Sequence, residues 1–432
     1  MATDAKSTLD QEAMRAWQWA AVIVTVGLNA LDGFDVLSIS FAAPGIAKDW
    51  GVDKATLGWV LSTELLGMAF GSMMLGGAAD RLGRRPTILG CLVAMTIGMF
   101  GAAHADAVPT LLVFRLLTGF GIGGMLASIN AAAAEISNNR WRNLAMALMV
   151  IGYPLGGVLG GTVVQKLLTS GSWRDVFAFG AYATAAFVPI VWFLVPESVA
   201  FLDRARLPGA LEKINRILQR FGHAPLPSLS RPKAEVRRSL ADIFKPGLVA
   251  TTILITCAYF AHATNFYYIL KWVPKIVVDL GFTPKAAAGV LTWANVGGAT
   301  GGAIFGLIAT RVDLKWLTIF TLLLAAIMTT WFGHGAVDLT SLSLRVGAAC
   351  FFGNAAFVGF YSLFAKVFPT HVRATGTGFA IGVGRGGAAL APVCAGYLFQ
   401  SGLGLQTVSI CMASGSLIGL LALAALTERR AD

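Results

Sequence analysis

The amino-acid sequence predicts an all-α integral membrane protein with twelve transmembrane helices in two pseudo-symmetric halves of six. Of its 432 residues, 56% are hydrophobic and 13% are charged, whereas a soluble globular protein carries about 25% charged residues. Apolar segments of about 20 residues, long enough to cross a bilayer, recur along the chain, and one polar stretch separates the first six from the last six. The 50 glycines suit close packing between membrane helices.

The twelve apolar segments can be placed in order along the chain. Their expected limits are 18–46, 55–79, 86–105, 108–136, 143–168, 174–195, 246–276, 285–310, 314–333, 340–368, 373–400 and 404–426. They define an N-terminal half at 18–195 and a C-terminal half at 246–426. A tail at 1–17, a basic linker at 196–245 and a second tail at 427–432 complete the chain. Helical periodicity at 210–221 predicts a helix inside the linker.

The net charge of +11 comes from basic residues in the connections between these segments. Lysines and arginines are denser in the linker, the tails and every second connection, which is the positive-inside pattern. The charge therefore reports topology, with both termini in the cytoplasm, and excludes a nucleic-acid partner. The five cysteines lie in apolar segments without C-x-x-C spacing, so we expect neither disulfides nor a metal site.

Two carboxylates interrupt the first apolar segment. Asp32 and Asp35 stand three residues apart, so their side chains fall on one face of a helix. An Asp at the centre of a membrane helix costs about 2.5–3.5 kcal/mol on insertion scales, so this face must meet the protein interior or a water-filled cavity. Arg115 of the fourth segment is expected at similar depth, so its guanidinium can pair with the carboxylate of one Asp. The carboxyl group of the other Asp is then free to gain and lose a proton. The structural alternative is that the pair only joins two helices.

The connection after the second segment carries the most specific motif. It reads Gly76-x3-Asp80-Arg81-x-Gly83-x-Arg85 and resembles the cytoplasmic loop signature of the major facilitator superfamily. The resemblance covers essentially the whole chain, because the number of segments, the central division and the loop position agree. It implies that Asp80 pairs with helix ends and charges of a cytoplasmic gate, together with Arg81 or Arg85.

Partners for this gate come from the end of the fourth segment, where Glu135 and Arg142 are the candidates. The matching connection of the second half carries Thr310 where an Asp is expected. We therefore do not expect a gating role for that second copy.

Within the superfamily, Asp32-Gly33-Phe34-Asp35 is similar to the first-helix motif of the aromatic acid:proton symporters. The resemblance implies a proton-coupling role for both aspartates together with Arg115 and Glu135, and a gating role for Arg373. The further matches are Arg115, Glu135, Pro196-Glu197-Ser198, Pro369-x3-Arg373-x2-Gly376-x-Gly378 and Arg385.

Cations at membrane depth in the second half are candidate anchors for an anionic substrate. Arg385 lies near the middle of the eleventh segment and suits bidentate binding of a carboxylate. Lys271 lies late in the seventh segment, where it either faces the cavity, forms a switchable pair with Asp35, or snorkels to the surface. Polar and aromatic side chains of the seventh and tenth segments are candidate cavity walls: His262, Asn265, Tyr267, Tyr268, Trp272, Asn354, Phe357 and Tyr361.

Glu64 in the second segment is a further acid whose role stays open between a second proton site and a wet position near the outer surface. Two G-x-G-x-x-G matches, at 119–124 and 382–387, follow no strand and are interpreted as helix-packing faces rather than nucleotide sites. No catalytic or metal-ligand spacing is present, so we expect no enzyme activity and no cofactor.

The sequence thus predicts a proton-coupled importer of an aromatic carboxylate of the hydroxybenzoate or protocatechuate type. We expect it to work as a monomer in a bacterial inner membrane, by alternating access and on the proton gradient alone. Two alternatives stay open, a proton symporter for aliphatic dicarboxylates or other organic anions, and an aromatic-acid chemoreceptor. Efflux of hydrophobic drugs is disfavoured, because cations at cavity depth suit anions.

Overall fold

The computed structural model describes residues 9–206, 208–229, 240–335, 338–369 and 372–426, without the side chains at 76–78, 80, 240 and 374. The described chain is helical, which confirms the predicted all-α class. Its first half contains six long helices: α2 (Ala16–Trp50), α3 (Lys54–Leu82), α4 (Arg84–Ala103), α5 (Val108–Ile136), α6 (Arg142–Ser170) and α7 (Trp173–Leu194). Its second half contains six more: α10 (Val249–Asp279), α11 (Pro284–Ile308), α12 (Leu314–Gly333), α13 (Leu339–Val367), α14 (Arg373–Gln400) and α15 (Leu405–Ala425).

Eleven helices of the described chain are long and apolar enough to cross a membrane. The long helix outside this set is α11, which is rich in glycine. A Cβ on its Gly297 or Gly301 would collide with the main-chain carbonyl of Gly347 or Phe351 in α13. This helix therefore packs backbone to backbone against its neighbour, as small residues permit in membrane bundles.

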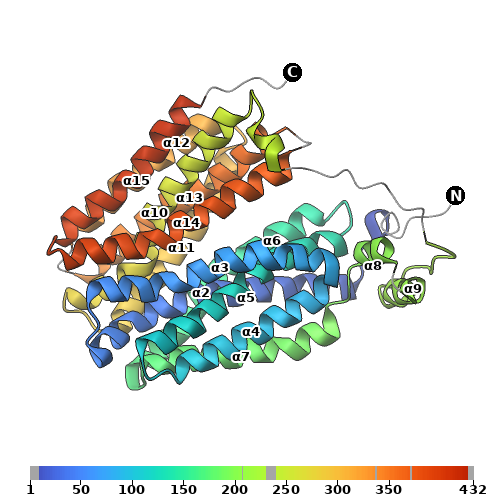
Figure 1. Cartoon of the computed structure of the whole chain (residues 1–432), viewed down its shortest axis with the longest axis horizontal. Coiled ribbons are helices and arrows are strands. Elements are labelled where there is room, and N and C mark those ends of the chain that lie inside the picture. Colours follow the sequence, from blue (N-terminus) through green and yellow to red (C-terminus); the bar gives the residue numbers. More distant parts are fainter. Residues whose placement is uncertain (1–8, 207, 230–239, 336–337, 370–371, 427–432) are drawn as a thin grey trace.

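The two sets of helices form two bundles that lie side by side (Figure 1). The linker helices α8 (Val199–Ala205) and α9 (Ala210–Arg220) lie at the end of the bundles where α2 begins and α15 ends, and we call this the linker end. A short 3-10 helix, η1 (Leu240–Phe244), precedes α10. The helix predicted at 210–221 is α9. The opposite end, with the turns between α2 and α3 and between α10 and α11, is the far end.

The two halves are packed together at the far end and diverge toward the linker end (Figure 1). Near the far end, a Cβ on Gly58 of α3 would lie 2.7 Å from the carbonyl oxygen of Pro392 in α14. Toward the linker end of α14, a Cβ on Gly378 or Gly382 would meet nothing within 4 Å. The structure is therefore the linker-open conformation of the two halves.

Glycines on one seam bring α3 and α5 into direct backbone contact. A Cβ on Gly67 or Gly71 would collide with main-chain atoms of α5, and one on Gly119 or Gly123 would collide with main-chain atoms of α3. Gly119 lies against the carbonyl oxygen of Glu64, so the G-x-G-x-x-G match at 119–124 is a packing face, as predicted. This seam also fixes which side chains of the two helices can meet.

Candidate functional site

The two aspartates of α2 are buried inside the protein. Asp32 is 1% exposed and Asp35 is fully buried. Neither carboxyl group receives a hydrogen bond from the described residues. The Asp35 carboxyl points at α7, where a Cβ on Gly180 would lie 3.2 Å from its Oδ1. The predicted interior face is present, but the carboxyl groups are not paired on it.

Arg115 of α5 is fully buried, and its ion-pair partner is Glu64 rather than an aspartate. Its guanidinium also donates to the main-chain carbonyl of Asp35 at 3.0 Å and to the sulfur of Met99 at 2.9 Å. The predicted pairing of Arg115 with an Asp carboxylate is therefore wrong in this conformation. The reason is the α3–α5 seam, which places Glu64 directly beside the arginine.

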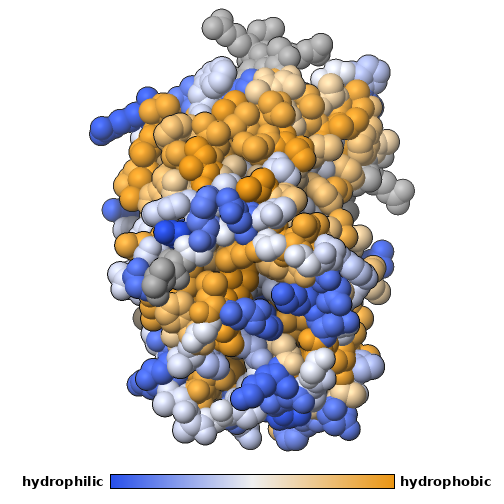
Figure 2. Space-filling view, turned by 90° about the vertical axis from the view of Figure 1, so that its left-hand side faces the viewer, coloured by the Kyte–Doolittle hydropathy of each residue, from blue (hydrophilic) through white to orange (hydrophobic). Residues whose placement is uncertain are grey.

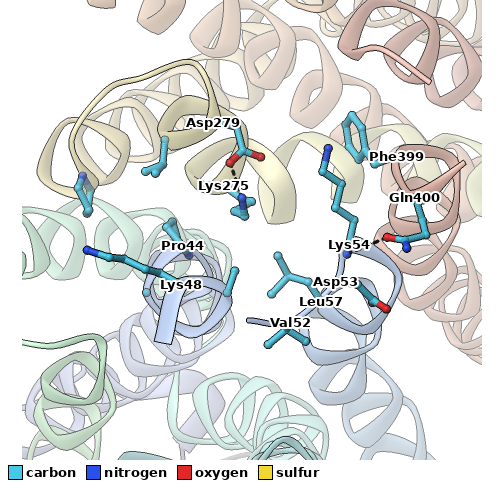
Figure 3. A pocket seen from close by; sticks show the side chains of 14 residues that line it. Pro44, Lys48, Val52, Asp53, Lys54, Leu57, Lys275, Asp279, Phe399 and Gln400 are labelled. Carbon is cyan, nitrogen blue, oxygen red and sulfur yellow. Dashed lines mark hydrogen bonds and ion pairs between the residues drawn. The ribbon is translucent and has the colours of Figure 1, made fainter. Parts of the chain in front are cut away.

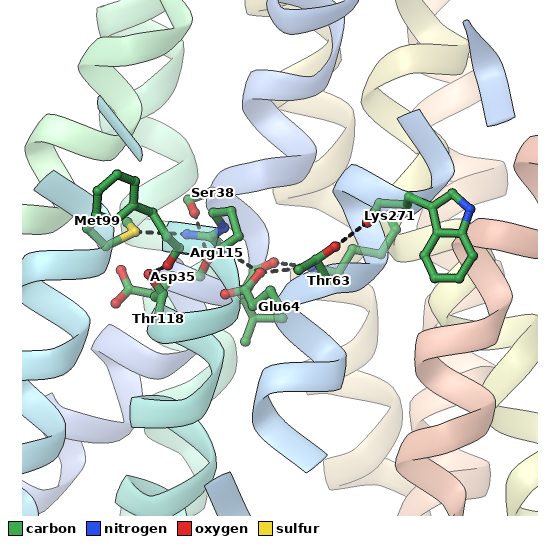
Figure 4. A network of polar contacts seen from close by, with 11 residues as sticks. Asp35, Ser38, Thr63, Glu64, Met99, Arg115, Thr118 and Lys271 are labelled. Atoms are coloured by element: carbon green, nitrogen blue, oxygen red, sulfur yellow. Dashed lines mark hydrogen bonds and ion pairs between the residues drawn. The ribbon is translucent and has the colours of Figure 1, made fainter. Parts of the chain in front are cut away.

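Lys271 of α10 is also fully buried, which excludes the alternative that it snorkels to the surface. Its ammonium lies 3.5 Å from the Glu64 carboxylate and donates to the main-chain carbonyl of Val36 in α2. Figure 4 shows Glu64 between Arg115 and Lys271. In this conformation the partner of Lys271 is thus Glu64, and not Asp35 as hypothesised.

Glu64 itself is fully buried, which excludes the wet position that the sequence left open. One carboxylate serves two cations, one from each half of the protein. We call Arg115, Glu64 and Lys271 the buried ion triad.

Arg385 lies deeper between the halves and is partly buried. Its guanidinium donates to the carbonyl oxygen of Met68 and the hydroxyl of Ser72 in α3, both at 2.8 Å. Gly384, the residue before it, packs against Tyr259 of α10, whose ring an added Cβ would hit. The hydroxyl of Tyr259 lies 3.3 Å from that of Tyr361 in α13, which is 48% exposed. The backbone of Tyr153 in α6 lies against Gly33, the residue after Asp32.

Several predicted wall residues are instead structural contacts within the second half. His262 contacts Ser416 and the carbonyl of Gly353, both at 2.9 Å, and is fully buried. The remaining buried polar contacts are Asn265 to Ser416 at 2.7 Å, Tyr268 to Ser409 at 2.8 Å, and Trp272 to the carbonyl of Pro392 at 3.0 Å. As cavity walls these four are wrong in this conformation, because they are buried contacts between helices of the second half; the Asn265 Oδ1 alone has no hydrogen-bond partner among the described residues.

The other predicted wall residues lie on α10 and α13, where Tyr361 is exposed and Phe357 is buried. Tyr267 is partly buried, and the hydroxyl of Tyr361 lies 3.3 Å from that of Tyr259. Phe357 packs edge-on against Tyr259 with ring centroids 5.2 Å apart. Asn354 donates to the carbonyl of Gly298 at 2.8 Å and so joins α13 to α11.

The motif loop after α3 is organised by Glu197, at the start of the linker. Its carboxylate accepts hydrogen bonds from the main-chain N–H groups of Arg84 at 2.7 Å and Ser198 at 2.8 Å, so it caps the start of α4. Gly83 adopts a φ of +107°, and a Cβ there would collide with this carboxylate. The glycine of the motif is thus required by backbone conformation and by the cap.

The other predicted gating residues lie at the same end. Arg85 donates to the carbonyl of Trp192 at 2.5 Å, and Arg81 is exposed. Glu135 pairs with Arg84 at 3.3 Å, and the partner of Arg142 is Asp10. Arg373 donates to the carbonyl of Phe368 at 3.2 Å.

The side chain of Asp80 and the surroundings of Gly76 lie outside the described residues, so their gating roles stay predictions.

A pocket of about 550 Å³ opens at the far end between the two halves (Figure 3). Lys48, Lys54 and Lys275 line it, together with apolar side chains and Phe399. Lys275 forms an ion pair with Asp279 on its own helix. Figure 2 looks onto this end and shows hydrophilic residues gathered among hydrophobic ones.

Sequence reasoning missed Tyr153 and Tyr259 as neighbours of the charged centre, and it left the role of Glu64 open. A signal for Glu64 was present, because Gly67 and Gly71 on α3 and Gly119 and Gly123 on α5 both have four-residue spacing. Glycines at this spacing on both helices predict close contact between α3 and α5, and such contact would place Glu64 against Arg115.

Known proteins resemble this chain along its whole length. A model of the Major Facilitator Superfamily matches residues 25–335. The gallate transporter of Pseudomonas putida is 28% identical over 98% of this chain and 93% of its own. The 4-hydroxybenzoate transporter PcaK of the same organism is 30% identical over 90% and 87%. The 3-(3-hydroxy-phenyl)propionate transporter of Escherichia coli is 29% identical over 95% of both chains.

A solved structure shares the fold. The inward open conformation of the xylose transporter XylE from E. coli superimposes with a TM-score of 0.73 at 17% identity, over 96% of this chain and 97% of the other. With the matches above, this confirms the predicted fold class and the sequence resemblance. The chain therefore belongs to the major facilitator superfamily, in its aromatic acid:proton symporter family, and is a transporter rather than an enzyme.

Proposed function

We propose that this transporter imports an aromatic carboxylate together with protons, by alternating access across a bacterial inner membrane. The linker end faces the cytoplasm in this proposal, so the linker-open conformation is the one that releases substrate inside. The basic linker and the positive-inside pattern support that orientation. Relatives named for gallate and 4-hydroxybenzoate support the substrate class.

The observation that carries the proton coupling is the pair of buried, unpartnered carboxyl groups. Asp32 and Asp35 receive no hydrogen bond from the described residues, while Arg115 is committed to Glu64. A carboxylate in a dry site without a partner is far more costly than a neutral carboxylic acid. The site therefore favours bound protons in the closed interior, and water entering as the halves move allows their release.

Arg385 is the proposed anchor for the substrate carboxylate. One of its terminal nitrogens binds α3 through Met68 and Ser72, and a guanidinium has five N–H donors. The remaining donors can bind a carboxylate, and the neighbouring tyrosine rings offer the apolar walls and hydroxyl groups that a hydroxybenzoate needs. This arrangement favours aromatic acids over aliphatic dicarboxylates, which need a second cation instead of rings.

Uptake into proteoliposomes tests this proposal. We expect a pH gradient, acid outside, to drive accumulation of 4-hydroxybenzoate or gallate, and competition by benzoate-type acids but not by succinate. Asp35→Asn should reduce gradient-driven accumulation by about tenfold or more and retain some exchange, because a neutral amide mimics the protonated carboxyl but cannot release a proton.

Asp53→Asn is the matched control, because Asp53 is an exposed aspartate that caps the start of α3 through Thr56. It should transport like the wild type. Unchanged accumulation by Asp35→Asn would refute its coupling role, and displacement by succinate alone would favour the dicarboxylate alternative. Binding of aromatic acids without any uptake would favour a chemoreceptor.

A further inference from the structure

The buried ion triad joins the two halves through a single carboxylate. Glu64 and Arg115 belong to α3 and α5 of the first half, whereas Lys271 belongs to α10 of the second half. All three side chains are fully buried. Lys271 has a further contact to the first half, the main-chain carbonyl of Val36.

The triad lies on the far-end side of Arg385. Lys271 stands eight residues before the end of α10 at Asp279, which is about 12 Å along a helix. Arg385 stands fifteen residues before the end of α14 at Gln400, or about 22 Å. An anion that enters from the far end therefore meets the level of Lys271 before that of Arg385.

Opening of the far end separates Lys271 from Glu64 but leaves Glu64 and Arg115 together. The glycine seam holds α3 against α5, so Glu64 and Arg115 move together as a neutral pair. Lys271 moves with the other half and loses both Glu64 and the carbonyl of Val36. The opened cavity is then left with an unpaired ammonium on its wall, and a cation in a cleft with apolar walls attracts anions.

We propose that Lys271 alternates between two carboxylates, that of Glu64 when the far end is closed and that of the substrate when the far end is open. Glu64 thus occupies the place of the substrate in the empty transporter. When the halves close again, Glu64 competes for Lys271 and displaces the substrate carboxylate toward Arg385. The competition gives the gate a preference for anions. The proposal thus has two steps, the contact of Lys271 with Glu64 in the closed state and its contact with the substrate in the open state. The second step rests on the anionic substrate proposed above.

The first step is tested without substrate or pH gradient, by labelling a cysteine reporter. Ser62 of α3 is 1% exposed and donates to the carbonyl of Ala389 across the two halves, so Ser62→Cys in a background without native cysteines becomes reactive only when the far end opens. Lys271→Gln should raise its labelling rate by a membrane-impermeant maleimide about tenfold or more, because the closed state loses its ionic contact between the halves.

Two variants separate this effect from a general loss of charge. Lys275→Gln removes a lysine one turn along α10 whose ion pair is with Asp279 on the same helix, and it should label like the parent. Lys271→Arg retains the cation and should restore labelling toward the parent rate. Equal labelling of Lys271→Gln and Lys275→Gln would overturn the closed-state contact.

The second step is tested by binding of 4-hydroxybenzoate to the same variants. If Lys271 contacts only Glu64 and never the substrate, Lys271→Gln should bind 4-hydroxybenzoate equally or more tightly, because its far-open state is more populated. Alternation between carboxylates predicts binding weaker by about tenfold, with Lys275→Gln unchanged. Unweakened binding by Lys271→Gln would overturn the substrate step. Absence of 4-hydroxybenzoate transport by the wild type would refute the proposed function and leave the labelling result to decide the gate contact.

Discussion

Replacement of Gly119 by Ala tests whether the α3–α5 seam holds the charged centre together. The added Cβ would collide with the carbonyl oxygen of Glu64. A carbon normally stays about 3.3–3.6 Å from a carbonyl oxygen, so the helices must separate by at least about 1 Å. Overpacking of this kind costs about 1–3 kcal/mol.

The same displacement weakens the ion pair between Arg115 and Glu64. Lengthening a charge pair from about 3 to about 4 Å loses about 1.4 kcal/mol at an effective dielectric constant of about 20. Together with overpacking, the expected loss in the free energy of unfolding is about 2–4 kcal/mol. We also expect slower transport, because Glu64 and Lys271 lose their relative placement.

Gly90→Ala is the matched control, because a Cβ on this exposed glycine of α4 meets nothing within 4 Å. The assay compares the two variants by thermal unfolding in lipid nanodiscs and by initial uptake rate in proteoliposomes. If Gly119→Ala unfolds and transports like Gly90→Ala, the seam does not position Glu64 and the reasoning is refuted.

Substitutions at two further residues test the anchor and the motif loop. Arg385→Lys retains the charge but loses the planar fork, so binding of 4-hydroxybenzoate measured by scintillation proximity should weaken about tenfold; unchanged affinity would exclude bidentate binding. Glu197→Ala removes the acceptor for the N–H groups of Arg84 and Ser198 and should lower stability by about 1 kcal/mol in thermal unfolding; Glu197→Gln, which keeps an acceptor oxygen, should recover part of that loss.

The helices could be predicted from sequence because bilayer thickness imposes the length of each apolar segment. The limits expected for α5 at 108–136 and for α12 at 314–333 are those of the structure. Hydrophobic pattern also placed Asp32, Asp35, Arg115 and Arg385 in the interior. These positions follow from the cost of exposing a charge to lipid, which any fold must respect.

The pairing of charges could not be predicted in the same way. Asp32, Asp35 and Glu64 are three acids at comparable depth, and periodicity along one helix does not say which of them meets Arg115. Contact between α3 and α5 decides it, through the glycines that let the backbones touch. The same holds for Lys271, which was expected at the cavity. Its ion pair with Glu64 comes from contact between the two halves and not from the pattern of its own helix.

The composition of α11 has a consequence for how the protein is made. This helix carries a glycine face that fits α13, which is synthesised after it. As it leaves the translocon, α11 therefore exposes to lipid a glycine face that is later filled by close backbone packing with α13. The contact that places α11 in the bundle can form only after both helices have been synthesised.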